Sequence, residues 1–146
     1  MPLPDSSAVD EALVSLLSAD AALLALCPNG VVFDLAPQGS TAFVLLSLLD
    51  GTDIYSQLDP KCDPAPLVEE RTYLVKAVNQ NTSGNVVKQA AYRIQQLLQH
   101  ARYPITGYLL LNSERVEPIR YTELDQGTGL RWQHRGGQYV VRVTPT

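Results

Sequence analysis

Residues 67–98 hold the two patterns that decide the fold of this chain: LVEERTYLVKAVNQNTSGNVVKQAAYRIQQLL. Residues 67–78 alternate between two faces, and the apolar members gather toward the C-terminal end, which predicts a strand. After a polar turn, residues near 83–100 place their apolar side chains on one helical stripe, with charged and amide side chains outside it. His100 is expected in the last turn of this helix, where the helix dipole favours a cation. A strand followed by an amphipathic helix predicts a sheet packed against helices.

The N-terminal part predicts a helix with a break, or two helices in series. Apolar residues between Val9 and Leu17 share one helical face, behind a cap at Ser6 or Ser7. Asp20 marks a second capping point, and Pro-Asn-Gly at 28–30 ends the helical segment.

Two apolar segments follow the helical region. Residues 31–35 predict a short strand. Residues 41–49 are nearly all apolar and predict a strand buried on both faces, with a helix as the alternative.

Residues 50–66 predict a long projecting loop. The segment contains Gly51, three prolines and four aspartates with little periodicity, and prolines at these positions prevent a long regular strand ladder. The aspartates lack the spacing of a calcium-binding loop, so we expect a solvated acidic loop rather than a metal site.

The last third of the chain predicts strands throughout. Gly136-Gly137 fits a bulge within one long strand better than a tight hairpin. The expected segments are strands at 106–111 and 116–124, with Pro118 at an edge or bulge, a turn at 125–129 and a strand at 130–143. We therefore expect an α+β fold in which a mostly antiparallel β-sheet packs against two main helices, in a single domain at 1–146.

The composition argues against several classes of protein. The net charge is −4, which disfavours a dedicated nucleic-acid binder, and 45% of the residues are hydrophobic, which disfavours general disorder. The longest apolar stretches are too short to span a membrane, and the N-terminus lacks the basic start of a signal peptide. We expect a protein that folds in a cytosol, with Cys27 as a buried free thiol and Cys62 as an exposed one; a Cys27–Cys62 disulfide is the alternative.

The motifs of common enzymes are missing. The sequence has no GxSxG nucleophile elbow and no HExxH metal box, and its two histidines, His100 and His134, lie far apart. Glu69 and Glu70 point to opposite faces of a strand and cannot form an acid–base pair by themselves. We expect no enzymatic activity, no cofactor and no metal.

The remaining polar and aromatic residues suit association. Tyrosine, tryptophan and arginine are enriched at the cores of protein interfaces, and His134 beside Arg135 fits a surface or interface position better than a catalytic base. The predicted contact residues are Asp53, Tyr55, Asp59, Asp63, Arg115, Arg120, Tyr121, Arg131, Trp132, His134 and Arg135.

Several segments, in this order, resemble the tail-terminator (tail-completion) proteins of long-tailed phages, the family that includes minor tail protein U of lambda-like phages. The resembling segments are the opening helix 10–23, residues 31–39, the strand 69–78, and the closing segments 120–125, 129–134 and 139–143. The resemblance implies a virion protein of the tail or neck, assembled in the host cytoplasm. It also implies a six-membered ring on the head-proximal end of the tail tube. Such a ring stops tube polymerisation, offers a surface to the head connector, and lets DNA pass without specific binding.

Three alternatives stay open. A neck or head–tail joining protein would differ from a tail terminator by partner rather than by chemistry. A small ligand-binding or enzymatic α+β domain would use the acidic loop, and a bacterial adaptor domain derived from a prophage is the third alternative.

Overall fold

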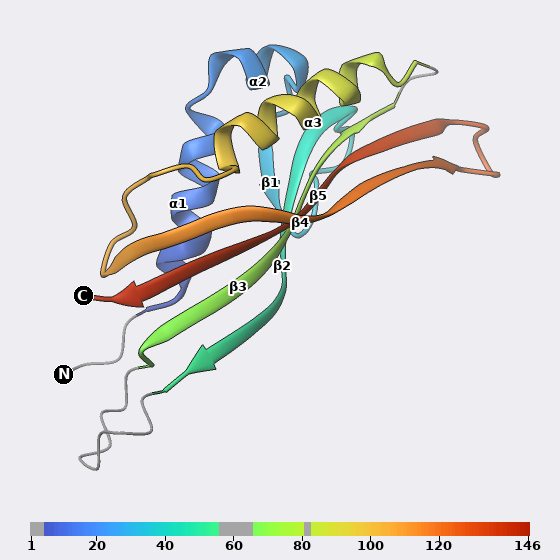
Figure 1. Ribbon diagram of the computed structural model, residues 1–146. Coiled ribbons are helices and arrows are strands. Elements are labelled where there is room, and N and C mark those ends of the chain that lie inside the picture. The colour runs from blue at the N-terminus through green and yellow to red at the C-terminus, as the bar shows by residue number, and fades with distance from the viewer. Residues whose placement is uncertain (1–4, 56–65, 81–82) are drawn as a thin grey trace.

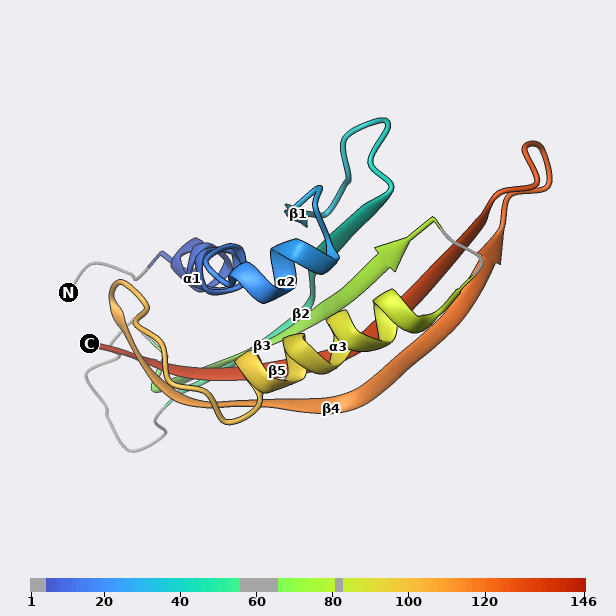
Figure 2. The same cartoon turned by 90° about the horizontal axis from the view of Figure 1, so that it is seen from above.

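The computed structural model describes residues 5–55, 66–80 and 83–146. These residues form one five-stranded sheet, in the order β1-β2-β3-β5-β4, with three helices on one of its faces (Figure 1, Figure 2). The β1–β2 pair is parallel and the other pairs are antiparallel, which confirms the expected α+β class. In chain order the elements are α1 (Ser7–Ser18), α2 (Ala21–Leu26), β1 (Val31–Phe33), β2 (Ala42–Ile54), β3 (Val68–Asn79), α3 (Asn85–Leu98), β4 (Tyr108–Leu124) and β5 (Arg131–Pro145).

The core lies between the helices and one face of the sheet. The predicted alternation of β3 is confirmed, since Tyr73, Val75 and Ala77 face the helices and are fully buried. The apolar stripes of α1 and α3 pack on this face through residues such as Leu13 and Ile94. Among the described residues, no helix is long and apolar enough to cross a membrane.

Two polar contacts tie the helices to the rest of the fold. The Tyr73 hydroxyl on β3 donates a hydrogen bond to Asp10 on α1, which anchors that helix to the sheet. Asp20 caps α2 by accepting from the Leu23 amide, as predicted, and its carboxylate also binds the Arg93 guanidinium at 2.6 and 2.8 Å. The Arg93 contact holds the pKa of Asp20 below its usual value, so α2 and α3 are joined by a charged hydrogen-bonded pair.

The ends of two helices differ from the sequence prediction. Ser6 precedes α1, but neither Ser6 nor Ser7 supplies a side-chain cap; the Asp5 carboxylate accepts from the Ser7 amide instead. His100 does not lie in the last turn of α3, because the helix ends at Leu98. His100 adopts a left-handed conformation with φ of 52°, and its amide donates to the Ser113 carbonyl at 2.6 Å.

β2 is longer than predicted and takes up the first residues of the predicted loop. The strand continues through the Asp50-Gly51 pair to Ile54, because residues 50–54 pair with residues 68–72 of β3 after a bulge at Leu49. The prediction of burial on both faces is correct only for the start of β2, since Leu48 and Leu49 are 44% and 48% exposed. Residues 56–65 of the predicted loop, which include Cys62, lie outside the described residues. Cys27 is a buried free thiol, as predicted.

The C-terminal hairpin contains two long strands rather than several short ones. β4 runs without interruption across Pro118 and carries two irregularities, between Leu110 and Asn112 and between Arg115 and Glu117. Pro118 is tolerated because β4 is the edge strand. β5 is one strand, as predicted, but its register with β3 is continuous through Gly136-Gly137, so the predicted bulge at this position is wrong.

The glycine pair serves close packing instead. A Cβ atom on Gly136 would overlap the Val75 carbonyl oxygen and lie 2.5 Å from the Lys76 Cα atom of β3. A Cβ atom on Gly137 would lie 2.6 Å from the Arg115 side chain on β4. The glycines therefore allow β5 to approach both neighbouring strands closely at this position.

We predict that Gly136→Ala lowers the free energy of unfolding by about 2 kcal/mol or more, because the new methyl group meets backbone that cannot move aside. Chemical denaturation followed by circular dichroism measures this change. The matched control is Gly127→Ala, whose Cβ would come no closer than 3.4 Å to another group and should change stability by less than about 0.5 kcal/mol. Equal stability of Gly136→Ala and the natural protein would contradict the packing argument.

Candidate assembly surface

The far end of the β4–β5 pair extends past the helix layer and past the end of β3 (Figure 2). β3 ends at Asn79, opposite Gln133, so beyond this point β4 and β5 form a two-stranded projection closed by a turn. We call residues 120–133 the distal hairpin. Its turn is held by the Asp125 amide, which donates to Leu130, and the Gly129 amide, which donates to Asp125. Every residue from 120 to 131 is exposed.

The structure brings together the two arginine–aromatic segments predicted as contact regions. Arg120 lies opposite Arg135, Tyr121 opposite His134, and Leu124 opposite Arg131. Arg115 lies further along β4, opposite Tyr139, and is half-buried. The residues at 115–121 and 131–135 therefore lie side by side in the β4–β5 pair. Arg120 and Arg135 lie on the sheet face that carries the helices, whereas Tyr121 and His134 lie on the other face.

Tyr121, His134 and Lys76 form a stacked cluster on the sheet face that carries no helix. The Tyr121 and His134 rings are nearly parallel at 4.3 Å, and the Lys76 ammonium donates to the Tyr121 hydroxyl at 2.5 Å. Lys76 is only 7% exposed, and the sequence analysis missed it. His134 was predicted at a surface or interface; the surface position is wrong, since His134 is 8% exposed. Neither of its ring nitrogens has a hydrogen-bond partner within the described structure. Burial, with the nearby Lys76 charge, lowers the pKa of His134, so the ring is neutral at pH 7.

Trp132 has a packing role as well as an exposed edge. Its ring meets Phe43 of β2 at 6.5 Å between centroids, and the side chain is half-buried. This contact joins the base of the distal hairpin to the sheet, so part of the predicted contact surface belongs to the monomer fold.

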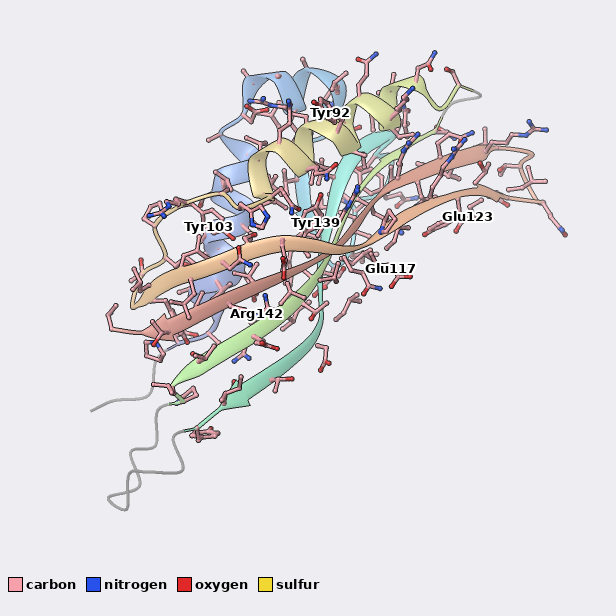
Figure 3. All side chains as sticks on the ribbon, in the orientation of Figure 1. Tyr92, Tyr103, Glu117, Glu123, Tyr139 and Arg142 are labelled. Atoms are coloured by element: carbon pink, nitrogen blue, oxygen red, sulfur yellow. The ribbon has the colours of Figure 1, made fainter. Side chains whose placement is uncertain are left out.

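A groove between α3 and the β4–β5 pair is strongly basic. We call it the basic groove and define it by its four cationic residues, Lys88, Arg115, Arg120 and Arg135. The start of α3 opens into it at Gly84 and Asn85, and the first turn of α3 holds no acidic residue. Lys88 and Tyr92, the latter labelled on α3 in Figure 3, were not among the predicted contact residues.

Arg142 belongs to a different group. On the helix-free face it bridges Glu70 of β3 and Glu114 of β4, each at 2.9 Å (Figure 3). The two carboxylates satisfy its guanidinium, so Arg142 does not add free charge to the basic groove.

Asp53 and Tyr55 lie at the opposite end of the sheet from the distal hairpin. Asp53 pairs with Arg71 at 2.9 Å, and Arg71 also binds the buried Glu69 at 2.5 Å, so Asp53 contributes to the fold. Asp59 and Asp63 lie outside the described residues. This end exposes apolar side chains and is called the apolar end; its members are Ile54, Tyr55, Leu67, Leu109 and Leu111.

The described residues offer little for catalysis. They contain no group of three or more His, Cys, Asp or Glu side chains that could hold a metal. Burial raises the pKa of Cys27 to about 11, which keeps its thiol protonated and a poor nucleophile. Burial and the adjacent Glu69 carboxylate also raise the pKa of Tyr108, so its hydroxyl stays protonated.

We predict that His134 makes the fold sensitive to mild acid. Its folded-state pKa lies below the ordinary 6.5, so the unfolded chain binds more protons and stability falls as the pH drops through about 6.5. Thermal unfolding between pH 7.5 and 5.5 should show this loss in the natural protein and in His100→Gln, which changes the exposed histidine. His134→Phe keeps an aromatic ring against Tyr121 and should remove that part of the loss; an unchanged pH profile in this variant would refute the assignment.

Comparison with solved structures supports the fold over nearly the whole chain. A chain of a structure described as the virion of a native gene transfer agent (GTA) particle superposes with a TM-score of 0.71, at 18% sequence identity. The match covers 95% of this chain and 96% of that one. A second solved structure has a TM-score of 0.56 at 10% identity, over 97% of this chain and 96% of its own. No protein-family model and no curated protein sequence matches the chain. This chain therefore shares its fold, over nearly its whole length, with a chain of the GTA virion structure.

Proposed function

We propose that this chain is a structural protein of a phage or phage-like virion, and that it acts as a tail terminator. In this role it forms a ring on the head-proximal end of the tail tube, stops further polymerisation and presents a surface to the head connector. The observation that carries the proposal is the end-to-end fold match to a chain of the GTA virion. The order of segments that resembles the tail-terminator family is independent support.

The uncovered ends of the sheet suit a protein placed between two partners. The distal hairpin exposes Tyr121, Leu124 and Leu130 to the extent of 43%, 54% and 42%. A two-stranded hairpin without a covering layer is marginally stable in water, so it gains from docking on another molecule. The apolar end lies at the other extreme of the same strands. One end would face the tube and the other the connector.

A neck protein one ring closer to the head is the competing function within the same particle. It would use the same two ends with different partners. Binding to the tail tube protein alone supports the terminator, whereas binding to the portal-side connector alone supports the neck protein.

Tube assembly tests the proposal directly. A tail tube protein from the same genome is polymerised with and without the purified chain, and tube lengths are measured by negative-stain electron microscopy. We expect tubes capped at one end and arrested in length when the chain is present. Equal length distributions with and without the chain, together with no binding to tube ends, would contradict the terminator role.

We predict that Arg131→Glu weakens assembly while the monomer stays folded, because Arg131 is exposed at the distal hairpin and makes no ion pair within the described residues. Native mass spectrometry measures the assembly, and circular dichroism measures the fold. Arg102→Glu makes the same charge change at an exposed position in the loop after α3 and should assemble normally. Unfolding of Arg131→Glu would show that the residue is structural instead.

A further inference from the structure

Charge is divided unevenly along this chain. Residues 1–60 contain eight acidic residues and neither lysine nor arginine. Residues 61–146 contain eleven lysines and arginines and seven acidic residues. The first part supplies α1, α2, β1 and β2, whereas β5, β4 and α3 come from the second part. β1 and β4 are the two edges of the sheet (Figure 1). The division of charge in the sequence therefore becomes a spatial one, with an acidic side and a basic side.

Internal pairing leaves the basic groove without partners. The ion pairs of the described residues use Arg71, Arg93 and Arg142. None of the four cations of the basic groove forms an ion pair with a described residue, and no acidic side chain lines the groove. Four positive charges so close together repel one another and favour a negatively charged occupant.

The opposite edge carries the matching features. We call Asp34, Leu35, Leu48, Leu49 and Asp50 the acidic edge, since the first two follow directly after β1 and the other three lie on the open part of β2. All five are exposed, and Leu35 is 83% exposed. Among the described residues, neither Asp34 nor Asp50 pairs with a cation; the Asp50 carboxylate accepts only the neighbouring Gly51 amide. β1 covers only residues 44–46 of β2, so the strand edge from Ser47 onward is open within the described structure.

We propose that the basic groove of one copy receives the acidic edge of the next copy. The two surfaces lie on opposite edges of one sheet, so they cannot meet within a single chain. A contact between two different patches is heterologous, and repeating it by a closed rotation gives a ring. The inference rests on the proposed ring and assigns the residues that join its subunits. The apolar members of the acidic edge would pack near Tyr92, which is 63% exposed beside the groove.

Charge-swap variants test the pairing. The groove variant carries Lys88→Glu, Arg120→Glu and Arg135→Glu, and the edge variant carries Asp34→Asn and Asp50→Lys. Asparagine is chosen at position 34 because the backbone there has φ of 66°, which asparagine tolerates well. Each variant alone should associate about tenfold more weakly or worse, because like charges then face each other or a paired charge is lost.

An equimolar mixture of the two variants should recover rings. In the mixture, the acidic groove of the groove variant meets the basic edge of the edge variant. The natural groove of the edge variant meets the natural acidic edge of the groove variant, so the two variants alternate around the ring. Native mass spectrometry should detect the two variants in equal numbers within each ring. Circular dichroism of each variant confirms that the monomers are folded, and Arg102→Glu serves as a charge control outside both surfaces.

The outcomes separate this inference from the proposed function. If the natural chain forms rings but the mixture does not recover them, the pairing is wrong and the ring stands. If the groove variant forms normal rings that no longer bind tubes, the groove contacts the tube and the pairing is again wrong. If the natural chain neither forms rings nor caps tubes, the proposed function itself fails.

Discussion

The helices of this protein are too short to cover its sheet, and this mismatch shapes the rest of the molecule. α3 has 14 residues and spans about 21 Å, whereas β4 has 17 residues and spans about 56 Å. The helix layer therefore covers the sheet where the core residues gather, including Tyr108 and Val143 near one end of the strands, and leaves the other end of β4 and β5 bare. The distal hairpin follows from this constraint. Long strands beyond a core are costly in a monomer and useful in an assembly.

Local patterns predicted much of this fold from sequence. The alternation of β3 and the apolar stripe of α3 were sufficient to predict these two elements, because each pattern reflects burial against a single layer. The pairing of strands that are distant in the sequence could not be predicted from such local patterns. The sequence predicts a loop that begins at Asp50-Gly51, yet β2 continues through this pair because residues 68–72 of β3 pair with it. Gly136-Gly137 reads as a bulge, yet the glycines allow close strand approach, which depends on neighbours from two other strands.

The candidate surface was predicted in part for the same reason. Arg120 and Arg135 were found because strand pairing brings together arginine-rich segments that lie close in sequence. Lys88 was missed, since only tertiary packing places α3 beside β4 and β5. His134 was expected at a surface or interface, and its burial depends on tertiary contacts with Tyr121 of β4 and Lys76 of β3. The division of charge along the sequence predicts two complementary surfaces only once the strand order is known, because the strand order places the acidic and basic segments on opposite edges of the sheet.

The central claim is that this chain closes into a ring at one end of a tail tube, and an image of that complex tests it most directly. Cryo-electron microscopy of the chain bound to its tail tube should reveal a closed ring at the head-proximal end. In that map the distal hairpin should be covered by a partner, and the basic groove should face the acidic edge of the neighbouring subunit. Isolated monomers, or copies bound along the tube wall with both surfaces exposed to solvent, would contradict the account.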